Sequence, residues 1–320
     1  MSQKQKVIIT GGAGLLGSAV THQILQEGVY TPVVMGRSEN PKRVLDIIDD
    51  IVYERGDVSD TTFLESVIAK HRPVKIFHFA TVLGDACETQ VDNATKVNVD
   101  GFIEMIEMVQ RYEVSQLLFS SSLTTFGEDL ESRTVHDRCL QRPGSFYGVT
   151  KLFQEGAGRF FRKKHGVDFR AIRYPAIIGP GSRAGGFVSY TSDIINYALK
   201  NEPYTVKFKP DMRLPLLHTK DAARAIIDLS NAPKESIKGV CYLVNGVTNP
   251  PTAQELADMV KAKLPNANTS FEVNEEWQRV LQTSALMVDD KYAKDEWGWS
   301  PTFDTYDKII DDFIAEHNKG

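Results

Sequence analysis

Cysteine is scarce in this sequence, and its cysteines show no pairing pattern. The 320 residues contain three of them, Cys87, Cys139 and Cys241, which lie far apart and include no CxxC pair. This spacing predicts neither a zinc site nor a disulfide framework. We expect three reduced and mostly buried thiols.

Runs of basic residues and long apolar runs are lacking as well. The formal net charge is -5 and no cluster of lysine or arginine stands out, so no nucleic-acid partner is expected. The apolar run in the opening stretch MSQKQKVIITGG is too short for a signal peptide or a membrane span. We therefore expect a cytoplasmic protein without a membrane partner.

What the first half does contain is an alternation of short apolar runs and helical patterns. Strands are predicted at 6–10, 31–35, 75–80, 116–121 and 168–174. A helix is predicted over 14–27, with Leu16, Val20 and Ile24 on one face and Gly28 at its end. Strands that alternate with helices predict an α/β fold of the Rossmann type, with a doubly wound and mostly parallel sheet.

The rhythm changes after Tyr174. A glycine-rich loop follows, then a helix over 218–230, a strand over 241–246, and a helix over 252–264 that Thr252 is placed to cap. We expect a dinucleotide-binding domain formed by residues 1–176 and about 216–245. A smaller substrate-binding lobe is expected from about 177–215 and 246–320.

The stretch TGGAGLLG follows the first strand and opens the first helix. Gly12, Gly14 and Gly17 fit the pattern GxGxxG, while Gly11, Gly14 and Gly17 fit GxxGxxG. Both spacings allow a tight turn and let the backbone approach a pyrophosphate at the helix N-terminus. Dinucleotide binding is predicted. Asp57, after the third strand, either hydrogen-bonds the adenine or is a turn residue.

Tyr147 and Lys151 stand four residues apart in the stretch SFYGVTKLFQEG, a spacing that puts both side chains on one face of a helix. A nearby ammonium favours the phenolate and lowers the phenol pKa, so the pair suits acid–base catalysis. The stretch SSSLTTFG ends the fifth strand, at the edge where such folds bind ligands. Ser122 is our candidate there for holding the substrate oxygen.

In this order, TGGAGLLG, GDVSD, VNVDG, SSSLTTFG and YGVTK resemble the extended short-chain dehydrogenase/reductase family over nearly the whole chain. Later stretches, such as KPDMRLPLLHTKDAARA, are similar to its short-chain-type L-threonine 3-dehydrogenases. The resemblance implies a catalytic triad of Ser122, Tyr147 and Lys151, in which Lys151 also holds the nicotinamide ribose. It also implies a homodimer through helices that contain roughly 93–110 and 147–164. The further cofactor contacts that it implies are Gly11, Gly14, Leu15, Leu16, Gly17, Asp57, Val58, Ala80, Thr81, Asn98, Tyr147, Tyr174, Ala176 and Ile177.

Two substrate loops depart from the threonine dehydrogenase pattern. Gly84 in LGDACE stands where those enzymes have a serine, and Phe187 and Val188 in AGGFVSY replace two hydroxyl donors. Losing these hydroxyls favours a different or larger substrate. Arg213 is expected to bind a carboxylate or phosphate, with a surface salt bridge as the alternative. The full set of expected substrate contacts is Gly84, Asp85, Ser122, Thr124, Tyr147, Gly186, Phe187, Val188 and Arg213.

The tip of the second strand bears on the choice of cofactor. NAD-specific relatives have an acidic residue about 20 positions past the glycine turn, and Arg37 stands there, followed by Ser38. An arginine pairs well with a 2′-phosphate, so NADP is favoured over NAD. In the alternative, Arg37 lies over the adenine of NAD and Glu39 binds the ribose.

These observations favour an NAD(P)-dependent oxidoreductase that interconverts a secondary alcohol and a ketone, both small molecules. One alternative is a nucleotide-sugar 4-epimerase or dehydratase with tightly bound NAD. The other is a non-enzymatic dinucleotide sensor, against which the intact Ser122, Tyr147 and Lys151 speak.

Overall fold

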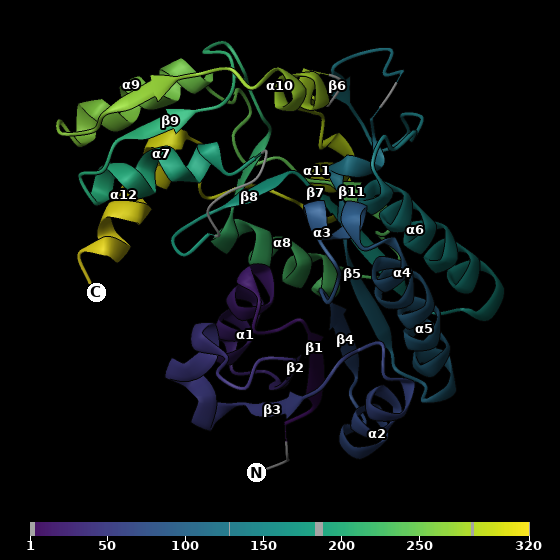
Figure 1. Cartoon of the computed structure of the whole chain (residues 1–320). Helices are drawn as coiled ribbons and strands as arrows, with labels where there is room; N and C mark the ends of the chain where they lie inside the picture. Colours follow the sequence, from purple (N-terminus) through teal and green to yellow (C-terminus); the bar gives the residue numbers. More distant parts are fainter. Residues whose placement is uncertain (1–3, 128, 183–187, 283–284, 320) are drawn as a thin grey trace.

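The computed structural model describes residues 4–127, 129–182, 188–282 and 285–319. Its centre is a seven-stranded sheet in the order β11-β7-β5-β4-β1-β2-β3, in which every pairing is parallel (Figure 1). The strands are β1 (Lys6–Thr10), β2 (Thr31–Gly36), β3 (Val52–Arg55), β4 (Lys75–His78), β5 (Gln116–Ser122), β7 (Phe169–Tyr174) and β11 (Cys241–Leu243). The doubly wound Rossmann-type fold is thereby confirmed. The chain order reverses between β1 and β4, which is where such sheets bind dinucleotides.

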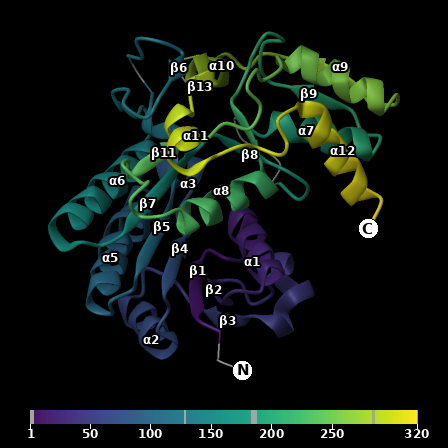
Figure 2. The ribbon, with the colours of Figure 1, turned by 180° about the vertical axis from the view of Figure 1, so that it is seen from behind.

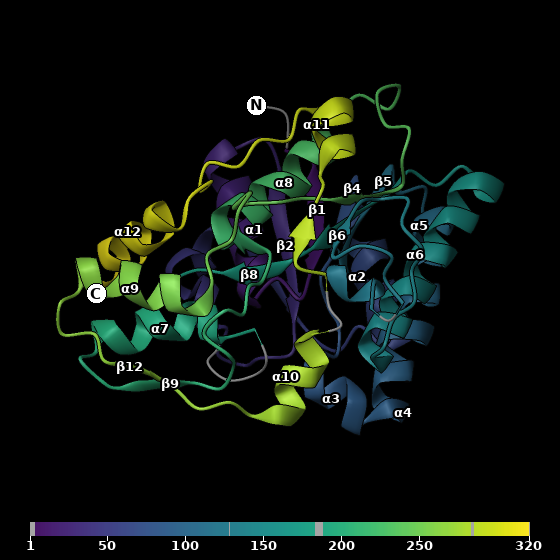
Figure 3. The same cartoon turned by 90° about the horizontal axis from the view of Figure 1, so that it is seen from above.

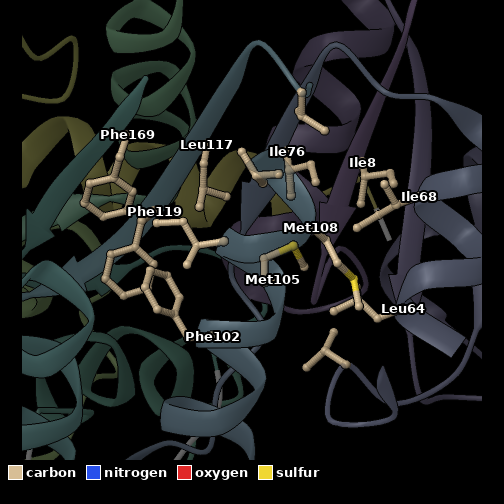
Figure 4. Close-up of a cluster of buried hydrophobic side chains, with 14 of the residues drawn as sticks. Ile8, Leu64, Ile68, Ile76, Phe102, Met105, Met108, Leu117, Phe119 and Phe169 are labelled. Atoms are coloured by element: carbon tan, nitrogen blue, oxygen red, sulfur yellow. The ribbon is translucent and has the colours of Figure 1, made fainter. Parts of the chain in front are cut away.

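Helices cover both faces of the sheet (Figures 1 and 2). Helices α1 (Leu15–Glu27) and α8 (Thr219–Asn231) pack together on one face. The other face carries α2 (Thr61–His71), α5 (Gly101–Arg111) and α6 (Phe146–His165). Alternate strand residues serve the two cores: Ile8 packs with α2 and α5, while Val7 and Ile9 pack with α1 and α8. Figure 4 shows the first of these clusters, in which Phe102, Phe119 and Phe169 lie together.

A further core, separate from the two that flank the sheet, lies in the smaller lobe, whose position Figures 1 and 3 show. Its elements are α7 (Tyr190–Leu199), β9 (Tyr204–Val206), α9 (Ala253–Lys263), β12 (Thr269–Phe271) and α12 (Tyr306–His317). Thr252 caps α9 as expected, in a capping box with Glu255. The pair formed by β8 (Ala176–Ile178) and β10 (Leu216–His218) joins this lobe to the sheet domain.

One segment beyond residue 246 packs with the sheet domain. Helix α11 (Lys291–Trp297) lies beside β11, and Ala293 and Trp299 enter the cluster around α1 and α8. The remaining elements are η1 (Lys42–Asp50), α3 (Gly84–Thr89), α4 (Val91–Ala94), η2 (Thr95–Asp100), η3 (Leu123–Thr125), β6 (Thr134–Val135), α10 (Glu275–Gln282) and β13 (Met287–Val288). Within the described ranges, no helix is both long and apolar enough to cross a membrane.

Candidate active site

The glycine turn forms a tight cradle at the switch point of the sheet. Gly11 has a left-handed φ of 66°, and a Cβ at Gly17 would lie 2.4 Å from the Gly11 carbonyl oxygen. Any larger residue at Gly17 would therefore displace the turn. Gly14 caps α1 without a side-chain hydrogen bond, so the N–H groups of Leu15, Leu16 and Gly17 face an open helix end. This arrangement fits a pyrophosphate.

The tip of β2 places Arg37 in solvent near Asp57. The Arg37 side chain is 75% exposed, and its Nη1 atom lies 3.7 Å from the Asp57 carboxylate. Ser38 donates a hydrogen bond to the Asn40 carbonyl oxygen, and Glu39 pairs with Arg55 at 3.1 Å. Asp57 also accepts hydrogen bonds from the backbone and hydroxyl of Ser59. Neighbouring Val58 is buried in the core.

Asn98 is a buried hub between the segment that follows β4 and helix α6. It lies in η2, a short π-helix, and is fully buried. Its Oδ1 atom accepts from the Thr81 hydroxyl at 3.0 Å and the Val82 N–H at 2.8 Å, and its Nδ2 atom donates to the Thr150 hydroxyl at 3.2 Å. The segment after β4 is also held to β1, because the Ala80 N–H donates a hydrogen bond to the Thr10 hydroxyl. π-helical turns often mark functional sites, and the sequence pattern did not indicate this one.

Ser122, Tyr147 and Lys151 come together at the carboxyl edge of the sheet. Ser122 ends β5, and Tyr147 and Lys151 face the sheet from α6. The Ser122 side chain lies close enough to the Tyr147 phenol to lower its pKa, and the Ser122 Oγ atom accepts a hydrogen bond from the Thr124 hydroxyl at 2.9 Å. The Lys151 ammonium lies 5.5 Å from the Tyr147 ring centroid and donates to the Ser120 carbonyl oxygen at 2.8 Å.

Burial changes the acidity of this pair. It raises the pKa of the Tyr147 phenol above its ordinary value, and the hydrogen bond from Ser122 opposes that rise only in part. Burial also lowers the pKa of the Lys151 ammonium to about 7. The expected lowering of the Tyr147 pKa by Lys151 is therefore wrong for this structure, because desolvation dominates the shift and Lys151 itself tends to lose its charge.

A buried ion-pair cluster, which the sequence analysis missed, anchors α6 to the sheet. Glu155 lies one turn beyond Lys151 with no exposed surface. Its carboxylate accepts from the Ser121 hydroxyl at 2.6 Å and pairs with the buried Arg173 of β7 through two contacts of 2.8 Å. The signal available in the sequence was the pair of arginines, Arg170 and Arg173, within the predicted strand DFRAIRY.

The remaining expected cofactor contacts lie around the junction to the lobe. Tyr174 is buried and donates to the Ala222 carbonyl oxygen at 2.9 Å. Ala176 and Ile177 follow in β8, where they pair with β10. Among the described residues, no cluster of His, Cys, Asp or Glu is arranged to hold a metal ion.

The expected substrate residues are brought together less completely. Gly84 begins α3 with a left-handed φ of 51°, and a Cβ there would meet open space. Val188 is 44% exposed just before α7. Arg213 donates to the Pro250 carbonyl oxygen at 2.6 Å and pairs with Glu255 at 3.3 Å. The salt bridge left open as the alternative is thus present, and substrate binding by Arg213 stays a prediction. Gly186, Phe187 and the side chain of Asp85 lie outside the described residues.

The parallel sheet and the glycine cradle at its switch point define a dinucleotide-binding α/β protein. Residues 7–244 match the model of the NAD dependent epimerase/dehydratase family, and the chain belongs to that family. It is therefore an NAD-dependent enzyme that acts on a CH–OH group.

Individual relatives resemble the chain over almost its full length. A mitochondrial L-threonine 3-dehydrogenase of Bos taurus is 29% identical over 304 residues, which cover 95% of this chain and 80% of the relative. The structure of an L-threonine dehydrogenase from Clostridium difficile has a TM-score of 0.89 at 25% identity and covers 99% of this chain and 98% of its own. A UDP-glucose 4-epimerase from Thermotoga maritima has a TM-score of 0.86 at 20% identity, with 98% and 99% covered, and shares the fold.

Proposed function

We propose that the chain is an NAD(P)-dependent oxidoreductase that interconverts a secondary alcohol and a ketone. A dinucleotide held at the glycine cradle would accept or supply the hydride. Tyr147 takes the hydroxyl proton from the alcohol or returns it to the ketone, and Ser122 hydrogen-bonds the same substrate oxygen. Lys151 holds the nicotinamide ribose. The observation that carries this proposal is the placement of Tyr147 beside Lys151, with Ser122 of β5 next to the phenol, at the sheet edge that bears the glycine cradle.

The raised pKa of Tyr147 bears on its role as a proton donor. A phenol whose pKa is raised by burial stays protonated at neutral pH. Tyr147 is therefore ready to donate a proton to a ketone, and the reverse reaction returns the proton to the same oxygen.

The surroundings of Gly84 support a substrate other than L-threonine. Gly84 supplies no hydroxyl, and the space beside it is open. Val188 presents an exposed apolar side chain where the related enzymes have a hydroxyl donor. A small zwitterion loses hydrogen bonds there, each worth about 1.5 to 3 kcal/mol when it involves a charged group. A bulkier or less charged alcohol, or the matching ketone, suits this site better.

The surroundings of Arg37 support NADP. The exposed guanidinium is free to meet a 2′-phosphate, because its contact with Asp57 is long at 3.7 Å. Glu39, the alternative partner of the ribose, is engaged with Arg55.

The second candidate function, a nucleotide-sugar epimerase or dehydratase, would instead keep NAD bound through the catalytic cycle.

Purified protein separates these functions. We expect it to emerge without bound dinucleotide and to reduce small ketones when NADPH is added, as measured by the loss of absorbance of the reduced cofactor. L-Threonine should give little or no turnover. NAD that stays bound through purification, with turnover of a nucleotide sugar, would establish the epimerase. If the protein bound the cofactor but turned over no alcohol, ketone or nucleotide sugar, the non-enzymatic dinucleotide sensor would be the remaining function.

We also propose that two copies associate through α6. Val149, Phe153 and Phe160 are exposed apolar side chains on this helix, at spacings that place them on one face. A contiguous apolar surface of this kind is typical of a protein interface. The cytoplasmic location stays a prediction.

A further inference from the structure

Tyr147 lies in the first turn of α6, where backbone N–H groups have no partner within the helix. The N-cap residue Ser145 accepts the hydrogen bond of the Gly148 N–H at 3.1 Å. The N–H groups of Phe146 and Tyr147 are satisfied from outside the helix. They donate to the two carboxylate oxygens of Glu88, each at 3.0 Å. The turn that carries the catalytic phenol is thus closed by a side chain from another element.

That element is α3, the short helix that begins at Gly84 on the expected substrate side. Its buried residue Cys87 lies on the Asn98 hub, with the sulfur 3.8 Å from the Asn98 amide nitrogen. Glu88, the next residue, is exposed and turned toward α6. Helix α3 is therefore held between the Asn98 hub and the first turn of α6.

We infer that Glu88 is a positioning residue that fixes the Tyr147 phenol relative to the substrate segment starting at Gly84. A carboxylate suits this role because it accepts hydrogen bonds at both oxygens and carries negative charge at a helix N-terminus. Glutamine would offer one acceptor and turn an NH₂ group toward the second N–H donor. The inference rests on the proposed function of Tyr147, but the contact itself can be tested without turnover.

Amide hydrogen exchange tests the contact. In Glu88→Gln and Glu88→Ala we expect the amides of Phe146 and Tyr147 to exchange at least about tenfold faster, because they lose hydrogen bonds to a charged acceptor. Asp92→Asn is the matched control, since Asp92 is an exposed carboxylate in neighbouring α4 to which the structure gives no side-chain partner among the described residues. Unchanged exchange in the Glu88 variants, or the same change in Asp92→Asn, would overturn the inference.

Kinetics test the positioning. With the best substrate of the wild type, we expect the Glu88 variants to lose about 10- to 100-fold in kcat while the Kd for the cofactor changes by less than about twofold. Combined with Tyr147→Phe, the loss caused by Glu88→Ala should disappear, because it acts through the phenol. A positioning role would be refuted if the kcat losses of Glu88→Ala and Tyr147→Phe multiplied in the double variant. It would also be refuted if kcat stayed unchanged in the Glu88 variants although their amides exchanged faster. A wild type without any turnover would instead refute the proposed function and leave the exchange test standing.

Discussion

Tyr147 and Lys151 lie one helical turn apart, and burial shifts both toward their neutral forms. The pKa of Lys151 falls to about 7 and that of Tyr147 rises. The Lys151 side chain is almost completely buried, and its ammonium donates a hydrogen bond to the Ser120 carbonyl oxygen. At neutral pH Tyr147 therefore keeps its proton, while Lys151 lies near its pKa and is about half protonated.

Replacing Tyr147 by phenylalanine tests this assignment directly. The ring is kept and the transferable proton is lost, so we expect kcat to fall about 100- to 10,000-fold while cofactor binding, measured by calorimetry, stays nearly intact. Tyr30→Phe is a suitable control, because Tyr30 is partly buried in another part of the molecule, where its ring faces Lys75. A Tyr147 variant that keeps more than a tenth of the wild-type kcat would contradict the assignment.

Arg37→Asp tests the choice of cofactor. We expect the wild type to prefer NADP, and the substitution to lower kcat/KM for NADP about 10- to 100-fold while sparing or improving NAD, because the new carboxylate repels the 2′-phosphate. The measurement is kcat/KM with each cofactor. Arg72→Asp, at the end of α2, serves as a control for surface charge. A wild-type preference for NAD, or an unchanged ratio in Arg37→Asp, would show that Arg37 does not bind the phosphate.

At the scale of elements, Glu155 holds α6 against the sheet. The same buried face of the helix carries Lys151 and Glu155, and Glu155 reaches β5 through Ser121 and β7 through Arg173. Removing one partner of a buried ion pair leaves the other charge uncompensated. The position of α6, which carries the proposed catalytic residues, and the stability of the protein are thus linked through the Glu155 carboxylate.

Glu155→Gln should therefore lower the free energy of unfolding by about 3 to 5 kcal/mol at neutral pH, as measured by urea denaturation. The Glu155 pKa is lowered in the fold by Arg173 and Ser121 despite its burial, so the native state binds fewer protons than the unfolded state. Its contribution is then present above the ordinary glutamate pKa and is lost as the pH falls through the folded value, so the variant should approach the wild type in acid.

The exposed pair Lys291 and Asp295 supplies the control, because Asp295→Asn should cost less than about 1 kcal/mol. Equal losses in the two variants would show that burial does not set the strength of the Glu155 contact.

At the scale of the whole molecule, the lobe and the α5–α6 layer lie on opposite sides of the sheet domain (Figure 3). The lobe lies at the edge where substrate is expected. The outer face of α6 is left with Val149, Phe153 and Phe160 exposed. This division lets two copies associate through α6 without covering the lobe.

Phe153→Asp should convert a dimer to a monomer, because a charge placed in an apolar interface must be desolvated. Light scattering coupled to size-exclusion chromatography measures the mass. Leu45→Asp is the control, since Leu45 is comparably exposed on η1, which packs against α1 on the other side of the molecule. A monomeric wild type, or a dimer that survives Phe153→Asp, would contradict the proposed interface.

Local patterns in the sequence were sufficient for individual strands, the glycine turn and the spacing of Tyr147 and Lys151. Apolar runs such as KVIIT are strands because their residues are buried on both faces, and Gly17 is required by a contact only six residues away, with Gly11. Helix α1 starts and ends where its glycines predict. These features depend on neighbours in the chain, so the sequence alone was enough to predict them.

Only the tertiary structure decided the features that depend on distant partners and on burial. The direction of the Tyr147 pKa shift follows from desolvation, which the spacing to Lys151 does not reveal. The pairing of Arg173 with Glu155 and the closure of α6 by Glu88 join segments far apart in the chain. A side chain's charge state and its partners are properties of the folded environment, and for that reason the sequence could name the candidate residues but not their electrostatics.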